Sequence, residues 1–326
     1  MKSRRKFLNT LGTGALLASS GIPDLKAFSG FRTSKPIRIG IIGAENSHTA
    51  AFGKLFNIDK KFPGVEVTMV WGETDEYAQK SMKAGNIPIQ VKETAEMLGK
   101  IDALIVDHRH AKYHLEPARP FVEAGIPTFI DKPFCYRASE GLAFLQMARK
   151  KGTPVTSYSS VAHSDATLDL RTQVKAMPDI SQAIITGPVD PDSPYGGIFF
   201  YGVHMVEPLM VIFGEDIQAV KVSRGGKAGN ALLKFASGLT ATLLFKNKAY
   251  GWETYVETSK AMVELKPKVK ESDPPRADAD MVQMFATGKE PRSQQSILNG
   301  ISVLEALEKS VLSEKWTDVE YLNIEG

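Results

Sequence analysis

The chain has 326 residues, of which 43% are hydrophobic and 24% charged, as in globular proteins large enough for two domains. The first 27 residues carry five basic residues and one acidic residue, so the rest of the chain has a net charge of about −1 and lacks the basic stripe expected of a nucleic-acid-binding protein. The single cysteine, Cys135, excludes an internal disulfide, and the chain has no cysteine-based zinc motif.

The start of the chain is typical of a twin-arginine export signal. Arg4 and Arg5 are followed by an apolar pair and then by a mildly apolar run that glycines interrupt. This run is too short and too weakly apolar to anchor the protein stably in a membrane. We therefore expect a signal peptide over 1–27, a linker over 28–35, the twin-arginine translocase as a partner, and a periplasmic or otherwise exported protein.

Short apolar runs then alternate with helical patterns as far as about residue 160. This alternation predicts an α/β domain with a doubly wound parallel sheet, which we assign to 36–160. Ligands of such sheets bind at the carboxyl ends of the strands. The clearest helical pattern covers 138–151, and the predicted strands are 37–42, 65–71, 102–106, 127–130 and 153–158.

The pattern changes after residue 160. A helix over 163–177, a loop rich in Pro, Asp and Gly, and a helix over 203–213 precede five runs with strand-like alternation. They predict an α+β domain over 161–326 with an open-faced, mainly antiparallel sheet. The charged run 266–273 is expected to be a solvated loop, and a last helix is expected over 293–313. The open sheet face favours a homo-oligomer.

The loop after the first predicted strand begins like a dinucleotide-binding turn and then departs from it. Gly43 stands where the G-x-G-x-x-G pattern begins, but Glu45 and His48 occupy the positions of the other two glycines. The next helix, expected over 47–56 and capped by Ser47, still offers N–H groups and a positive dipole end to an anion. Glu45 adds negative charge beside a pyrophosphate, whereas His48 offers a donor.

Two further motifs carry candidate chemistry. Asp131 and Lys132 precede a proline at the end of the predicted strand 127–130, where a sheet of this type places active-site residues. In the second domain, His204 and Glu207 lie one helical turn apart and share a helix face. His204 titrates in the range that general acid–base chemistry needs. The structural alternatives are an ordinary turn and a core histidine.

The ordered set of these features resembles the Gfo/Idh/MocA oxidoreductases, which include glucose-fructose oxidoreductase and inositol dehydrogenase. The resemblance covers the mature chain and rests on the turn at Gly43, the Asp-Lys-Pro at 131–133, the Gly-Val-His at 202–204, the antiparallel sheet and the ending "SILNGISVLEALEKSVLSEKW". It implies a Rossmann domain that holds NAD or NADP and a second domain that holds a sugar or cyclitol. It also implies that Lys132 polarises the reacting oxygen while His204 moves the hydroxyl proton.

The chain also departs from the family pattern. An aspartate usually lies four residues before the histidine, and here that position is Phe200. The orienting carboxylate is then lost unless Glu207 or Asp192 replaces it, and Tyr201 joins these two as a candidate for catalysis or substrate contact.

The acid that would hold the ribose hydroxyls after the second strand is displaced as well. Gly72 stands at the expected place, and Glu73 follows one residue late. The residues expected to bind the cofactor are Gly43, Ala44, Glu45, Asn46, Ser47, His48, Glu73, His110, His114, Asp131 and Lys132.

A metal site is a further alternative for the segment after the third strand, because Asp107, His108, His110 and His114 offer zinc or iron ligands. His108 and His110 are only two residues apart, however, and His114 matches a histidine that the family places in its cofactor region. We therefore expect a polar loop and no metal site.

Together these features predict an exported NAD(P)-dependent oxidoreductase with a tightly held cofactor and a carbohydrate-like substrate. Twin-arginine export carries folded proteins, and the resemblance implies that no free nicotinamide pool exists outside. The cofactor must therefore return to its starting state in each cycle. Coupled turnover of two substrates satisfies this requirement, and so does an NAD-dependent glycosidase or epimerase that oxidises the sugar transiently. A non-catalytic ligand-binding protein with the same fold is the remaining alternative.

Overall fold

The structure is a computed structural model that describes residues 35–177 and 179–325. The predicted signal peptide over 1–27 lies outside the described residues, as does the predicted linker over 28–35 except for its last residue. Within the described part of the chain, no helix combines the length and the apolar character needed to cross a bilayer.

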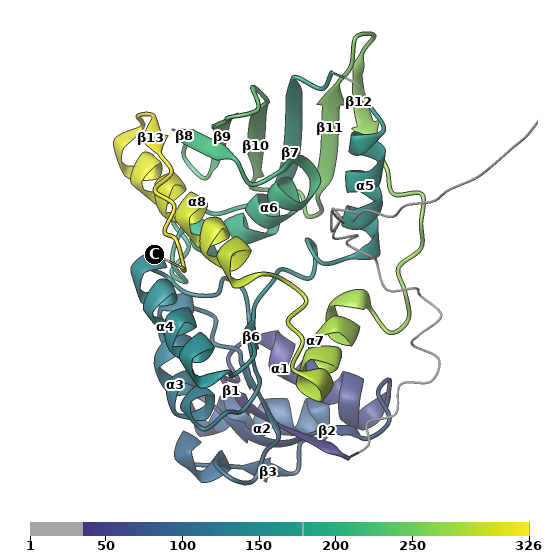
Figure 1. Cartoon of the computed structure of the whole chain (residues 1–326), viewed down its shortest axis with the longest axis vertical. Helices are drawn as coiled ribbons and strands as arrows, with labels where there is room; N and C mark the ends of the chain where they lie inside the picture. Colours follow the sequence, from purple (N-terminus) through teal and green to yellow (C-terminus); the bar gives the residue numbers. More distant parts are fainter. Residues whose placement is uncertain (1–34, 178, 326) are drawn as a thin grey trace, which may run out of the picture. The chain divides into compact units, whose positions relative to one another are not determined.

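The first half of the described chain forms a six-stranded parallel sheet with the order β3-β2-β1-β4-β5-β6 (Figure 1). The order reverses at β1 and β4, which creates the switch point where doubly wound sheets bind ligands. Ile41 and Ile42 point to opposite faces and both are fully buried, so both faces are covered. The predicted sheet is confirmed, and its strands are β1 (Ile37–Ile42), β2 (Val65–Trp71), β3 (Ile89–Gln90), β4 (Ala103–Val106), β5 (Thr128–Ile130) and β6 (Val155–Thr156).

Four α-helices accompany this sheet. The first two pack closely through glycines, since a Cβ added to Gly53 would lie 2.6 Å from the Cα of Gly85. Single 3₁₀ turns cover Thr94–Met97 and Ala111–Tyr113. The helices are α1 (Ser47–Gly53), which continues as a π-helical turn (Lys54–Ile58), α2 (Asp75–Gly85), α3 (Leu115–Glu123) and α4 (Ala138–Lys151).

The start of α1 differs from the prediction, which placed the cap at Ser47. Asn46 is the N-cap, because its side-chain oxygen accepts the N–H of His48 at 3.3 Å, and Ser47 is exposed. An asparagine can do more at this place than a serine. Its amide also donates to Asp107 at 2.8 Å and so ties the helix start to the end of β4.

The second half forms a seven-stranded sheet with the order β12-β11-β7-β10-β9-β8-β13. Neighbouring strands are antiparallel except for β7 and β10. Leu233 and Leu243 are buried on one face, whereas Leu232 and Leu244 are 37% and 44% exposed on the other, which confirms an open face. The strands are β7 (Gln182–Pro188), β8 (Ile217–Gly225), β9 (Ala228–Phe235), β10 (Thr240–Lys246), β11 (Glu253–Glu257), β12 (Met262–Leu265) and β13 (Thr317–Asp318).

Helices α6 and α8 pack against each other and against this second sheet (Figure 1). Helix α8 also contacts α4 of the first sheet, and Glu305 on α8 accepts the N–H of Ala138 at the start of α4. The predicted boundary at residue 160 falls between β6 and α5 and stays a prediction. The helices of this half are α5 (Asp165–Lys175), α6 (Ile198–Phe213), α7 (Arg276–Thr287) and α8 (Gln294–Ser313).

Candidate functional site

The carboxyl ends of β1, β4, β5 and β6 meet at one edge of the parallel sheet. Residues from distant parts of the sequence therefore come together there. They are Gly43 after β1, Asp107 after β4, Asp131 and Lys132 after β5, and Ser159 shortly after β6.

The loop after β1 presents its backbone N–H groups to an anionic oxygen. Gly43 has a φ of +111°, and a Cβ there would lie 2.7 Å from the backbone carbonyl carbon of Asp107, so only glycine fits. The N–H groups of Ala44 and Glu45 donate to Oε2 of Glu73 at 2.8 and 2.9 Å. The loop thus keeps the geometry of a turn that binds oxygen ligands.

Glu73 takes part in this arrangement as a carboxylate. Its other oxygen lies 2.8 Å from Nδ1 of His108. Burial alone would raise the pKa of Glu73, but hydrogen bonds from His108 and from backbone N–H groups lower it to about 2. The acid of this chain, Glu73, stands one residue after the expected position, Gly72, and it is still ionised at the end of β2.

Glu45, at the second glycine position, is engaged by two other segments. Its Oε1 accepts a hydrogen bond from the Tyr195 hydroxyl at 2.9 Å and lies 3.9 Å from Nη1 of Arg109. Arg109 also donates to the Tyr195 hydroxyl at 2.9 Å and lies 4.0 Å from the centre of that ring. The extra negative charge is therefore compensated by a guanidinium.

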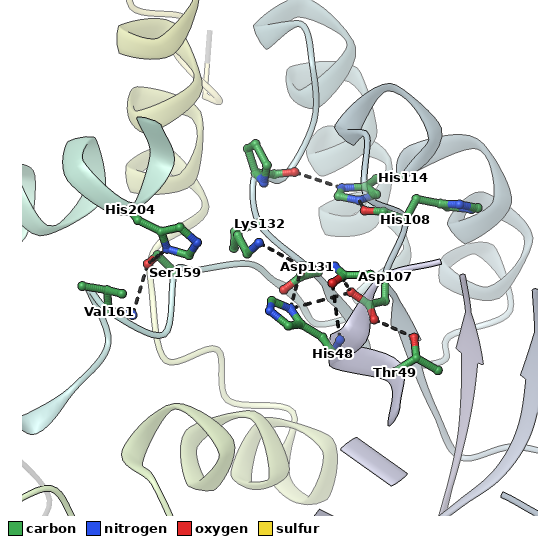
Figure 2. Close-up of polar contacts among 12 residues, drawn as sticks. His48, Thr49, Asp107, His108, His114, Asp131, Lys132, Ser159, Val161 and His204 are labelled. Atoms are coloured by element: carbon green, nitrogen blue, oxygen red, sulfur yellow. Dashed lines mark hydrogen bonds and ion pairs between the residues drawn. The ribbon is translucent and has the colours of Figure 1, made fainter. Parts of the chain in front are cut away.

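His48, at the third glycine position, belongs to an ionic cluster with Asp107 and Asp131 (Figure 2), and the Asn46 amide hydrogen-bonds to both aspartates. Nδ1 of His48 lies 3.1 Å from Oδ2 of Asp131. The Asn46 amide donates to Asp107 at 2.8 Å and to Asp131 at 3.3 Å, and the Thr49 hydroxyl donates to Asp107 at 2.6 Å. The ends of β1, β4 and β5 are thus joined by side chains.

The two aspartates of this cluster have opposite pKa shifts. Burial and the neighbouring Asp131 raise the pKa of Asp107 well above its usual value. Burial acts in the same direction on Asp131, but the charges of Lys132 and His48 hold the pKa of Asp131 well below its usual range. Asp131 in turn raises the pKa of His48. Asp131 therefore carries the negative charge of the cluster.

The histidines considered as metal ligands have separate partners. The ring nitrogens of His114 lie 2.9 and 2.8 Å from the carbonyl oxygens of Pro133 and His108, and burial lowers the pKa of His114 to about 4. His110 lies against the Tyr136 ring at 5.0 Å. His110 and His114 therefore support the loops around the site and do not converge on one point.

A different set of metal-type ligands does converge. Within residues 35–177 and 179–325, ligand atoms of His48, Asp107 and Asp131 lie within 4.8 Å of one another. The Lys132 ammonium, however, lies 3.7 Å from Asp131 and supplies a positive charge there, and the Asn46 amide donates to both carboxyl groups. The charges are thus balanced by the chain itself, which fits an ion-paired cluster better than a cation site.

Lys132 and His204 come from different halves of the chain and lie close enough for the charge of Lys132 to contribute, after burial, to lowering the pKa of His204. Lys132 follows β5 and His204 lies on α6, and each is 7% exposed. Figure 2 shows the Lys132 side chain between His204 and Asp131, with its ammonium turned toward Asp131 and one ring nitrogen of His204 turned toward the Lys132 side chain. The two residues that the resemblance assigns to the reacting oxygen are therefore brought together.

Among the residues that the structure describes, a serine hydroxyl and no carboxylate hydrogen-bonds to His204. Nδ1 of His204 lies 2.7 Å from Oγ of Ser159. Glu207 accepts the backbone N–H of Ser159 at 2.6 Å and pairs with Arg292 at 2.6 Å, so it supports the serine and not the imidazole directly. Ser159 was not among the predicted site residues. A polar run, Ser157 to Ser160, at the carboxyl end of a predicted strand was the available signal.

The other two candidates near His204 differ in their surroundings. Asp192 pairs with Arg224 and its side chain is 55% exposed, so it is engaged elsewhere than at the imidazole. The Tyr201 ring lies 5.5 Å from the His204 ring, and the Trp252 ring lies 5.7 Å from it on another element. His204 is therefore bordered by aromatic rings.

A cavity of about 550 Å³ opens beside Lys132. Asp131 and Lys132 border it, whereas His204 does not line it. Asp278, in the first turn of α7, also lines it, and no described residue hydrogen-bonds its carboxyl group. Burial raises the pKa of Asp278 to about 6. The apolar part of the lining consists mainly of Phe52, Phe129, Tyr158 and Met281.

Helix α7, which forms one wall of this cavity, was not predicted. Its apolar residues recur at helical spacing, which was the available signal. The polar segment before it and the consecutive prolines Pro274 and Pro275 favoured a loop. The buried apolar residues of α7 are Ala279, Met281, Val282, Met284 and Phe285.

The residues around the Gly43 loop fit a dinucleotide. The N–H groups of Ala44 and Glu45 already bind a carboxylate oxygen, and Glu73 stands at the end of β2, where a Rossmann domain receives the ribose hydroxyls. His48 occupies a glycine position, but its side chain bonds to Asp131, and α1 still packs closely on α2 through Gly53. The altered loop therefore retains its donors and its packing.

Residues 37–159 match the Gfo/Idh/MocA family model, described as an oxidoreductase family with an NAD-binding Rossmann fold. The fold is similar to apo scyllo-inositol dehydrogenase from Lactobacillus casei, with a TM-score of 0.75, 15% identity, and coverage of 88% of this chain and 99% of that chain. The Lactobacillus casei enzyme with bound NAD(H) and scyllo-inositol has a TM-score of 0.70 and 16% identity, and the match covers 87% of this chain and 99% of that chain. GenD2 from gentamicin A biosynthesis in complex with NAD has a TM-score of 0.73 and 12% identity, and the match covers 89% of this chain and 98% of that chain. No curated protein matches the sequence.

At such low sequence identities the solved structures show only that the fold is shared. The family model identifies residues 37–159 as an NAD-binding Rossmann domain. The resemblance read from the sequence is confirmed. Residues 37–159 therefore match the NAD-binding Rossmann domain of the Gfo/Idh/MocA oxidoreductase family.

Proposed function

We propose that this protein is an exported, NAD-dependent oxidoreductase that acts on a sugar, a sugar derivative or a cyclitol. The observation that carries the proposal is the convergence of Lys132 and His204, two buried groups from different halves of the chain, beside the Gly43 loop. A bound nicotinamide would supply hydride transfer to or from a substrate carbon.

The chain's own residues would act on the oxygen attached to that carbon. The Lys132 ammonium is buried and lies 3.7 Å from the Asp131 carboxylate, so it can donate to and polarise the oxygen. His204 would contact the same oxygen from α6, held in place by Ser159. Because both groups are buried, water competes little for them.

Aromatic rings around His204 support a carbohydrate-like substrate. Tyr201 and Trp252 flank the imidazole, and Tyr250 lies 5.1 Å from Trp252. Flat apolar faces beside a few polar groups suit rings that carry both C–H faces and hydroxyl groups. The similarity to a dehydrogenase solved with scyllo-inositol makes inositols the first compounds to test.

The ionised Glu73 favours NAD over NADP. A carboxylate at the end of β2 accepts ribose hydroxyls and repels a 2′-phosphate. The low pKa of Glu73 keeps this charge present throughout the physiological range. Tight retention of the cofactor is proposed because export through the twin-arginine pathway would separate the protein from the cytoplasmic pool.

Retention of the cofactor favours reactions that return it to its starting state. Coupled oxidation and reduction of two substrates does so, and so does an epimerase or glycosidase that oxidises a sugar transiently. These outcomes differ in their products, and a panel of polyols, ketoses and glycosides incubated with the protein alone distinguishes them.

The cofactor is the first thing to test. The folded protein, purified from cells that express the full chain, is denatured, and the supernatant is assayed for NAD(H) and NADP(H). Cofactor is then titrated into stripped protein by calorimetry. We expect NAD(H) in near-stoichiometric amount or a clear binding isotherm for NAD. Absence of both retained and added binding would leave a non-catalytic ligand-binding protein as the better description.

A further inference from the structure

The hydrogen bonds around Ser159 determine which nitrogen of His204 carries the proton. Oγ of Ser159 accepts the backbone N–H of Val161 at 3.1 Å and that of Ala162 at 3.4 Å. These two donors occupy both lone pairs of the hydroxyl oxygen. The hydroxyl hydrogen must therefore be donated to an acceptor.

Nδ1 of His204, 2.7 Å away, is the acceptor for this hydrogen. No other described group accepts from Oγ of Ser159, and Ser159 is fully buried. If Nδ1 carried a proton instead, three donors would compete for two lone pairs, and the hydroxyl hydrogen would be left without a partner. A buried polar hydrogen is rarely left unpaired.

We propose that Ser159 fixes His204 as the neutral tautomer with its proton on Nε2, so that His204 and Lys132 form a pair of donors that receives the carbonyl oxygen of a ketone substrate. The tautomer rests on the geometry around Ser159 alone. The substrate class rests in addition on the proposed oxidoreductase function.

The environment of His204 keeps the imidazole neutral. Burial and the neighbouring Lys132 both lower the pKa of His204 well below its usual value. A carboxylate partner would favour the other tautomer. It would accept a hydrogen bond from a proton on Nδ1, and Nε2 would then carry no proton and could act as a base. Replacing that carboxylate by a serine hydroxyl therefore changes the imidazole from a base into a donor.

Lys132 and His204 then have separate roles in the reduction of a ketone. A bound reduced nicotinamide would supply the hydride to the carbonyl carbon, and the π electron pair would then move to the oxygen. Lys132 transfers a proton to that oxygen, so an N–H bond breaks and an O–H bond forms, and the amine later regains a proton from water. His204 keeps its Nε2 proton and only donates a hydrogen bond, since losing the proton would leave an imidazolate.

Nitrogen NMR of protein labelled with ¹⁵N-histidine tests the tautomer without any ligand. The chain has six histidines, and the signals of His204 are identified by their loss in His204→Gln. We expect a protonated Nε2 and an unprotonated Nδ1 in the wild type. Ser159→Ala should shift the Nδ1 signal toward a mixture of tautomers, whereas Ser160→Ala, which alters the exposed neighbouring serine, should leave it unchanged.

A proton on Nδ1 of His204 in the wild-type protein would overturn the proposal, and this holds even if Ser159→Ala does not fold. Failure of the proposed function has a different signature. In that case the protein would bind no nicotinamide cofactor in the titration, while the ¹⁵N spectrum could still report the Nε2–H tautomer.

Discussion

The Gly43 side and the His204 side of the site depart from the family pattern in opposite directions. On the Gly43 side, Glu45 and His48 stand where glycines are expected, and each has acquired a partner of opposite charge, Arg109 and Asp131. On the His204 side, the expected aspartate is replaced by the neutral Phe200, and the imidazole is held by a hydroxyl group. The side chains of the Gly43 side are therefore held by paired charges, whereas His204 is held by a hydrogen bond whose direction sets its tautomer.

This difference predicts that the two sides respond differently to substitution and to pH. Changes on the Gly43 side should alter stability and cofactor choice through uncompensated charge. Changes at His204 itself should alter turnover with little effect on stability, because its partner is the hydroxyl of Ser159 and no described carboxylate pairs with the imidazole.

The largest expected effect is on turnover. Lys132→Ala and His204→Ala should each lower turnover by roughly 10²- to 10⁴-fold, the range for a positioned acid, base or donor at the reacting atom. Product formation from scyllo-inositol, or from another compound that supports turnover, measures this. Lys54→Ala is the matched control, because Lys54 lines the same cavity but pairs with Asp59 at the surface. Circular dichroism checks the fold, and full activity in both variants would remove the two residues from the site.

The two buried aspartates provide a paired test of stability. Asp131→Asn should lower the free energy of unfolding by about 3–5 kcal/mol, because it leaves Lys132 and His48 without their counter-charge. Asp107→Asn removes a carboxylate that burial disfavours. The new amide oxygen can accept from Asn46, and the amide N–H can donate to the Thr49 hydroxyl, whose hydrogen then goes to the carbonyl oxygen of Gly43, so the effect should stay within about 1 kcal/mol. Urea denaturation at pH 7 compares them. Equal losses would contradict the unequal charge distribution in the cluster.

The pH dependence of the same pair has a definite sign. The pKa of Asp107 is raised in the folded protein, so the ionised form opposes folding, and the wild type gains stability as the pH falls through this raised value. Asp107→Asn lacks this gain. We therefore expect the stability of the wild type relative to Asp107→Asn to increase as the pH is lowered from 8 toward 5. A difference that does not change with pH would mean that Asp107 keeps an ordinary pKa.

The smallest expected effect concerns cofactor choice. Glu73→Gln removes the charge that disfavours a 2′-phosphate but keeps an acceptor for the N–H groups of Ala44 and Glu45. The preference for NAD over NADP should fall by about tenfold, or ~1.4 kcal/mol. Calorimetric titration of both cofactors measures it, and Glu76→Gln, in the exposed first turn of α2, serves as the control. An unchanged ratio would place the ribose away from Glu73.

Much of the fold could be read from the sequence. The parallel strands are buried on both faces, so each reads as an apolar run, and the open face of the second sheet leaves an alternating pattern in β9 and β10. Elements with weak local signals were missed. Strand β3 has two residues and lies at an edge, and α7 follows a polar segment rich in proline.

The candidate site could be read only in part. Lys132 and His204 were found because their positions follow the ordered motifs of a family. Ser159 and Asp278 were not found. The position of Ser159 after a predicted strand was a weak signal that does not single out one serine of the run, and nothing in the local sequence of Asp278 distinguishes it from ordinary polar residues. Their roles depend on residues from other elements. Ser159 is a site residue because it hydrogen-bonds to His204, and Asp278 because it lines the cavity.

The sequence by itself determined the class of fold, the place of the ligand edge and the residue types at that edge, because these follow from local periodicity and from the geometry of parallel strands. The tertiary structure alone decided which charges are compensated and which hydrogen bonds form. The pairing of Glu45 with Arg109, of His48 with Asp131 and of His204 with Ser159 joins residues that are distant in the chain. Such contacts depend on distances of a few ångströms between elements, which no local pattern encodes.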